Sequence, residues 1–151
     1  MSRAPDDLAQ RLFERAGPLL QRLRGDPSIT DGAAMLAKAR QVIESMNELD
    51  QIAVINAHPR IGERPGKLSV ASRAEQGDAE PPEVMRRLAV LNEEYEAKFG
   101  FRFVVFVNRR SKAAIVPLLE ARLRGTRDEE RRTAVREILA IAEDRWKRGE
   151  A

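Results

Sequence analysis

The chain has 151 residues, of which 42% are hydrophobic and 34% are charged. This composition supplies the core of one ordinary domain and excludes the low hydrophobicity of a disordered chain. No apolar run approaches the ~20 residues of a membrane helix, and the first ten residues lack the apolar core of a signal peptide. We therefore expect a cytoplasmic protein that does not associate with membranes.

The charge balance argues against a nucleic-acid partner. Lys and Arg number 27 against 24 Asp and Glu, so the formal net charge is only +3, and the arginines are interspersed with carboxylates from end to end. A nucleic-acid-binding protein normally concentrates its basic residues in one patch. A weak nucleic-acid-binding module is kept as an alternative, which a salt titration of oligonucleotide binding would test.

The chain contains no cysteine and one histidine, His58. This excludes disulfides, thiolate nucleophiles and metal sites that need two imidazoles. If the protein performs acid–base chemistry near neutral pH, His58 is the one side chain whose unperturbed pKa suits that task.

Helical periodicity dominates the first 58 residues. Apolar residues from Leu8 to Leu23 recur at helical spacing, and Gly17 with Pro18 predicts a break between two helices. Thr30 is predicted to cap the next helix, whose apolar face runs to Met46. A further apolar stretch is expected to end at or just before His58, because Pro59 disfavours the helical conformation at the residue preceding it.

The second half begins with a Gly- and Pro-rich stretch, 62–82, which predicts a long functional loop. Helices are predicted over 82–99, from Ser111 onward, and after the capping box of Thr126 and Glu129. Residues 101–107 predict an extended, largely buried connector, because a lone strand cannot pair its own backbone. We expect one all-α domain over residues 1–151, a bundle of about seven to nine helices with a long loop carrying site residues.

His58 is a candidate catalytic residue because of its position as well as its rarity. It closes a helix, it opens a loop, and Pro59 restricts its backbone. The negative end of the helix dipole is expected to raise the pKa of the imidazole. The alternative is that His58 only caps the last carbonyls of its helix, which is the more frequent role of such a residue.

A second candidate group is Ser72, Glu75 and Gln76. On a helical turn Ser72 and Glu75 share a face, so both can point into a cleft. The same spacing is the signature of a capping box, and a short capped turn can hold a carboxylate and an amide rigidly.

Two further segments offer candidate binding residues. Phe101, Phe103 and Val104 supply apolar walls, and backbone N–H groups of an extended segment can face a ligand. Arg145 lies between Ala142 and Trp146 near an apolar stripe. By its pattern alone Arg145 is assigned, like most arginines of this chain, to the solvated surface.

Taken together, four strings identify a resemblance: INAHPRIGERP, ASRAEQ, LNEEYEAKFGFRFVVFV and EILAIAEDRW. In this order they resemble the 2-oxo-4-hydroxy-4-carboxy-5-ureidoimidazoline (OHCU) decarboxylases of urate degradation. The resemblance implies an all-helical fold, a homodimer, a small-molecule substrate and the product (S)-allantoin. Two departures are Arg102, where many relatives have proline, and VNRRS in place of a glycine-containing turn.

Carried over position by position, the resemblance implies roles for eight residues. Catalysis is assigned to His58 and Glu75, with Pro59 as the positioning neighbour of the histidine. The residues implied in substrate binding are Pro59, Ser72, Gln76, Phe101, Val104 and Arg145.

The implied reaction needs no cofactor. The carbon that loses CO2 lies beside a C=N bond of the substrate, which accepts the electrons of the broken C–C bond, so we expect neither a metal nor an organic cofactor. The alternative from another class is a helical interaction module that has kept the fold and lost the chemistry.

Overall fold

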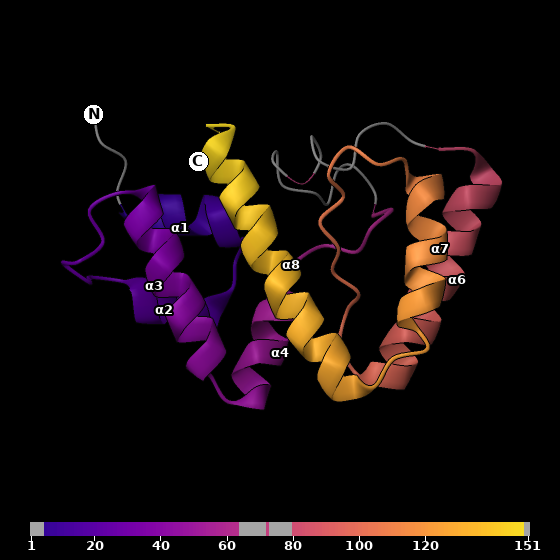
Figure 1. The fold of residues 1–151 in the computed structure, drawn as a ribbon, viewed down its shortest axis with the longest axis horizontal. Helices are drawn as coiled ribbons and strands as arrows, with labels where there is room; N and C mark the ends of the chain where they lie inside the picture. Colours follow the sequence, from indigo (N-terminus) through magenta and orange to yellow (C-terminus); the bar gives the residue numbers. More distant parts are fainter. Residues whose placement is uncertain (1–4, 64–71, 73–79, 150–151) are drawn as a thin grey trace. The chain divides into compact units, whose positions relative to one another are not determined.

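Helices form most of the chain, as the periodicity predicts. The computed structural model describes residues 5–63, 72 and 80–149. Within these residues there is no β-strand, and the helices (Figure 1) are α1 (Pro5–Phe13), α2 (Gly17–Leu23), α3 (Gly32–Ser45), α4 (Glu48–Asn56), α6 (Pro82–Phe99), α7 (Lys112–Arg122) and α8 (Arg127–Lys147). The predicted all-α class is confirmed.

The chain divides into two compact units. The first unit comprises Met1–His58 and Val135–Ala151, and the second comprises Pro59–Ala134. One division falls at the peptide bond between His58 and Pro59, and the other falls inside α8.

In the first unit, α2 packs against α1, α3 and α4. The predicted break at Gly17 and Pro18 is confirmed, because these residues open α2. The predicted cap Thr30 is wrong: Asp31 has the extended N-cap conformation and accepts a 2.8 Å hydrogen bond from the Ala34 amide. Asp31 immediately precedes the first helical residue, so its side chain, unlike that of Thr30, reaches the exposed amides of the first turn.

Apolar side chains of these helices and of the C-terminal part of α8 form the core of the first unit. The fully covered residues include Leu12, Phe13, Leu19, Met35, Ala39, Ile43, Val54, Ile55, Ile138 and Ala142. The first residue of α3, Gly32, lies directly against the Trp146 side chain of α8. A Cβ added to Gly32 would lie 2.3 Å from Cε3 of Trp146. Glycine at position 32 is therefore required by the indole ring that covers it.

The second unit is built on α6, which packs against α7. Pro82 opens α6, and Gly100 ends it with φ of 80°, both as predicted. Ser111 caps α7 by accepting a hydrogen bond from Ala114, and Pro117 lies inside that helix. The capping role of Thr126 is also confirmed, because its hydroxyl accepts a 3.3 Å hydrogen bond from the Glu129 amide.

Residues 101–107 are extended and lie outside helices and strands, as predicted. Phe101, Phe103, Val104, Val105 and Val107 of this segment are all buried. The turn that follows has Asn108 at φ of 49° and Arg109 at φ of 64°. This left-handed conformation is the one that glycine favours, so it accounts for the expectation of a glycine-containing turn here, and Asn108 and Arg109 adopt it without glycine.

None of the helices in the described part of the chain combines the length and the apolar character that crossing a membrane requires.

We predict that Gly32→Ala destabilises the protein by about 1–3 kcal/mol, because the new methyl group must displace the Trp146 ring from a packed core. Gly17→Ala is the control, since a Cβ there meets nothing within 4 Å at the start of α2. Thermal unfolding followed by circular dichroism measures both. Equal melting temperatures for the two variants would contradict the close packing of α3 on Trp146.

Candidate functional site

The end of α4 positions His58. Asn47 caps the start of α4 by accepting a hydrogen bond from Asp50, and Ala57 is the C-cap. The His58 amide then donates a 3.2 Å hydrogen bond to the Ile55 carbonyl. The prediction that this helix ends just before the histidine is confirmed. The side chain is buried, with 3% of the residue exposed.

Arg145 is also buried, with 1% of the residue exposed, so its assignment to the solvated surface is wrong. Its Nη2 lies 2.9 Å from Oε1 of Glu14, and its Nη1 donates to the carbonyls of Arg11 at 3.0 Å and Leu12 at 3.4 Å. These carbonyls belong to the last turn of α1, where a helix has no partners of its own for them. The guanidinium is therefore held inside the first unit by a carboxylate and a helix terminus.

The imidazole of His58 lies within the electrostatic field of this ion pair. Burial lowers its pKa, and the Arg145 cation lowers it further; the Glu14 carboxylate and a hydrogen bond with the Val54 backbone oppose these effects only in part. The resulting pKa is about 4. The expectation that the helix dipole raises this pKa is wrong, because desolvation and a buried cation outweigh a partial charge at a helix terminus. His58 is neutral at pH 7 and can accept a proton.

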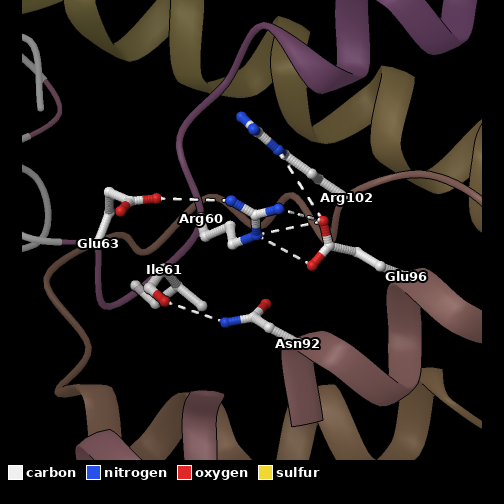
Figure 2. Close-up of polar contacts among 6 residues, drawn as sticks. All are labelled: Arg60, Ile61, Glu63, Asn92, Glu96 and Arg102. Carbon is white, nitrogen blue, oxygen red and sulfur yellow. Dashed lines mark hydrogen bonds and ion pairs between the residues drawn. The ribbon is translucent and has the colours of Figure 1, made fainter. Parts of the chain in front are cut away.

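The segment that follows His58 is anchored to α6 (Figure 2). Arg60 forms a two-pronged ion pair with Glu96, with its Nη2 2.8 Å from Oε1 and its Nε 3.0 Å from Oε2. One turn earlier on α6, the buried Asn92 side-chain amide donates a 3.1 Å hydrogen bond to the Ile61 carbonyl. Residues 60 and 61 are thus attached to one face of α6 at positions four residues apart.

Two further charged groups complete the cluster in Figure 2. Glu63 lies 3.8 Å from Nη1 of Arg60, and Nε of Arg102 lies 4.0 Å from Oε1 of Glu96. Arg102 therefore extends the anchoring network of the segment after His58.

The extended segment of the second unit is held by arginine side chains. Arg122 donates a 2.7 Å hydrogen bond to the Val104 carbonyl, lies over the Phe103 ring at 4.6 Å, and forms a 2.7 Å ion pair with Glu130. Arg127 donates to the Phe99 carbonyl and lies 5.7 Å from the Phe101 ring centroid. The backbone around Phe101 and Val104 is thereby fixed.

Tyr95 joins this network to the aromatic core. Its hydroxyl donates a 2.7 Å hydrogen bond to Glu130, and its ring contacts those of Phe99, Phe101 and Phe103 at centroid distances of 4.6, 6.1 and 5.4 Å. The Phe101 side chain is therefore one wall of a packed aromatic cluster.

Of the remaining predicted site residues, the structure describes Ser72 and Pro59. Ser72 is helical and buried, and Pro59 is half-buried at the start of the second unit. Glu75 and Gln76 lie outside the described residues. His58 and Arg145 thus belong to the first unit, whereas Ser72, Phe101 and Val104 belong to the second.

Glu14 is the residue that sequence reasoning missed, because a single glutamate after a helix carries no motif. Asn92 and Tyr95 lie in the string LNEEYEAKFGF, which contributes to the family resemblance. Their anchoring roles depend on contacts with Ile61 and Glu130 that form only in the folded chain. No group of three or more His, Asp or Glu side chains suited to a metal ion occurs within residues 5–63, 72 and 80–149.

Fold and site together define an all-helical protein built around one buried, uncharged imidazole and a buried ion pair. The chain belongs to the OHCU decarboxylase family, whose model matches residues 3–147.

Curated relatives agree with this assignment. The chain is 30% identical over 141 residues to a 2-oxo-4-hydroxy-4-carboxy-5-ureidoimidazoline decarboxylase of Haloferax volcanii, covering 91% of this chain and 83% of the relative. It is 32% identical over 104 residues to the decarboxylase of the same name from Halalkalicoccus jeotgali, covering 66% and 58%. It also matches a uric acid degradation bifunctional protein of a Bacillus species at 27% identity, spanning 27% of that longer protein.

Solved structures confirm the fold. A crystal structure of an OHCU decarboxylase in the presence of (S)-allantoin superposes with a TM-score of 0.77 at 22% identity, covering 94% of this chain and 95% of that one. An (S)-allantoin synthase structure gives a TM-score of 0.69 at 19% identity, covering 93% and 47%.

The pKa of His58 predicts a pH dependence of stability. The folded-state pKa of about 4 lies below the ordinary value of 6.5, so between these values the unfolded chain binds more protons. The contribution of the neutral imidazole to the free energy of unfolding is complete above about pH 6.5. It is lost as the pH falls towards 4, a change on the order of 3 kcal/mol. Urea unfolding at a series of pH values between 7 and 4 measures this change in the free energy of unfolding.

His58→Asn is the control for that measurement, since it keeps every carboxylate and removes the titrating ring. The fall in the free energy of unfolding between pH 6.5 and pH 4 should be smaller in this variant. Parallel curves for the two proteins would show that His58 titrates normally in the folded state.

We predict that Asn92→Ala destabilises the protein by about 1–3 kcal/mol, because the buried Ile61 carbonyl loses its hydrogen-bond donor. Glu93→Ala, an exposed change at the next residue of α6, is the control and should have little effect. Urea midpoints at pH 7 compare the two variants, and an unchanged midpoint for Asn92→Ala would refute the anchoring role.

Proposed function

We propose that this protein decarboxylates OHCU to (S)-allantoin in urate degradation, as a carboxy-lyase that needs no cofactor. Membership of the OHCU decarboxylase family over residues 3–147 supports the reaction class. The observation that carries the proposal is the state of His58: the one histidine of the chain lies buried and uncharged in the field of a buried arginine.

The protein needs only to orient the substrate and to transfer protons to and from it. When the bond between the ring carbon and its carboxylate breaks, CO2 leaves and the electron pair moves into the ring, towards the adjacent C=N bond. The nitrogen of that bond gains a proton. The hydroxyl on the carbon that lost CO2 then gives up its proton and becomes a carbonyl, and the neighbouring carbon is protonated. The substrate is thus its own electron acceptor.

In this proposal neutral His58 polarises that hydroxyl or accepts its proton. A negatively charged substrate beside the imidazole would raise the pKa of His58 from its low value and make it a better base. Desolvation also favours loss of CO2, because the carboxylate charge is less stable away from water than the charge-delocalised transition state.

The other predicted residues are proposed to bind the substrate. Arg145 binds a carbonyl or carboxylate oxygen, and Glu75 accepts hydrogen bonds from N–H groups of the ring or ureido arm. Delivery of a proton to one face, by His58 or Glu75, sets the S configuration. The residues proposed to complete the binding site are Pro59, Ser72, Gln76, Phe101 and Val104.

We also propose that the protein is a cytoplasmic homodimer and that residues 1–151 act as one domain. The absence of cysteine supports a reducing compartment. The match of one family model across both compact units supports a single domain.

The test is to generate OHCU in situ from urate with the two preceding activities and to follow circular dichroism. The protein should accelerate formation of optically active allantoin above the spontaneous racemic rate. His58→Asn should abolish the acceleration while its far-ultraviolet spectrum stays helical. Glu75→Gln should lower the rate of decarboxylation at least tenfold, which corresponds to about 1.4 kcal/mol of transition-state stabilisation. An active His58→Asn variant would exclude this mechanism, and an inactive wild type would favour the non-catalytic helical module.

A further inference from the structure

Glu14 has an unusual backbone conformation. It directly follows the last residue of α1 and has φ of 57°, in the left-handed region. Glycine is the ordinary residue at this position of a helix terminus, because a Cβ there is strained. A glutamate held in this conformation indicates that its side chain makes an interaction that glycine could not supply.

That interaction is the ion pair with Arg145. The carboxylate of Glu14 has 13% of its side-chain surface exposed, and its Oε1 lies 2.9 Å from Nη2 of Arg145, whose side chain is 1% exposed. A buried cation is costly unless a charge or hydrogen-bond acceptors compensate it. The left-handed turn directs the carboxylate of Glu14 to the guanidinium that caps α1.

The same pair acts on His58. Among the described residues, the charged groups whose fields reach the imidazole are Arg145 from α8 and Glu14 from the end of α1, and they act on its pKa in opposite directions. On α4, which ends just before His58, the Val54 backbone acts on this pKa in the same direction as Glu14. All three side chains belong to the first compact unit.

We propose that Glu14 is a positioning residue for the decarboxylation: it orients the guanidinium of Arg145 and offsets part of its charge beside His58. This inference rests on the proposed function, in which Arg145 binds the substrate and His58 accepts a proton. Glu14 touches neither the reacting atoms nor the substrate and acts only through Arg145 and His58.

Two variants separate this role from a structural one. Glu14→Gln keeps the size and removes the charge. Glu14→Gly also removes the side chain, but it relieves the left-handed backbone, so part of the lost stability is regained and the variant should fold. Glu44→Gln is the matched control, since Glu44 forms an exposed ion pair with Arg40 on α3 in the same unit.

The first measurement is steady-state decarboxylation. We expect kcat/KM to fall at least tenfold in Glu14→Gln and in Glu14→Gly, and to stay within twofold of wild type in Glu44→Gln. Glu14→Gly should lose stability but still fold, with a helical far-ultraviolet spectrum and one cooperative thermal transition, so its loss of activity is not due to unfolding. Wild-type activity in a folded Glu14→Gly variant would overturn the proposal.

A double-mutant cycle tests whether Glu14 acts through Arg145. Arg145→Met is compared with the double variant that also carries Glu14→Gln. If Glu14 works through the guanidinium, the second change should lower kcat/KM no further. A further tenfold fall in kcat/KM in the double variant would contradict the proposal that Glu14 acts through Arg145.

The third measurement does not depend on activity. Because the sequence contains a single histidine, the imidazole proton resonance of the untagged protein belongs to His58. Its titration should give a pKa of about 4 in wild type, a lower pKa in Glu14→Gln and a higher one in Arg145→Met. An unchanged or raised pKa in Glu14→Gln would refute the electrostatic part of the inference.

These readouts also distinguish the inference from the proposed function. If the wild-type protein shows no decarboxylation while the resonance shifts as expected, the proposed function fails and the coupling of Glu14, Arg145 and His58 stands. If decarboxylation is present and neither Glu14 variant changes kcat/KM or the titration, the inference alone fails.

Discussion

The candidate site depends on a buried guanidinium that is compensated from two sides. Arg145 comes from the last helix, yet its partners are Glu14 and the carbonyls that end the first helix, 131 and more positions away in sequence. A cation at this depth would be strongly destabilising without them. Its presence, together with desolvation, keeps His58 neutral. One set of contacts therefore joins the two ends of the chain and sets the protonation state of the imidazole.

Arginine has the same structural role elsewhere in this chain. Arg122 binds the Val104 carbonyl, Arg127 binds the Phe99 carbonyl, and Arg110 binds the carbonyls of Phe106 and Val107. Extended segments and helix ends leave such carbonyls without backbone partners, and a forked guanidinium can satisfy them while its stem packs on apolar rings. Backbone anchoring thus explains four arginines of this chain, which are Arg110, Arg122, Arg127 and Arg145.

The string HPRIG of this chain combines a proposed catalytic residue with anchoring residues. Within HPRIG, His58 is the proposed proton acceptor, whereas Arg60 and Ile61 attach the following backbone to Glu96 and Asn92 of α6. A histidine at a helix end followed by an unanchored loop would sample many orientations, which would reduce the effective concentration of the base. Anchoring the loop within three residues of the imidazole limits that freedom.

The sequence alone determined the helical class, the ends of α4 and α6, the buried extended segment after Gly100 and the place of His58 directly after a helix, because these depend on local periodicity and on Pro and Gly chemistry. It misjudged Thr30, where adjacent polar residues compete for one cap, and Arg145, whose pattern resembles that of a surface residue. The lowered pKa of His58 and the part played by Glu14 were decided by tertiary structure. Both depend on groups brought together from the ends of α1 and α4 and from α8, and burial strengthens the electrostatic interactions among them, which no local sequence pattern records.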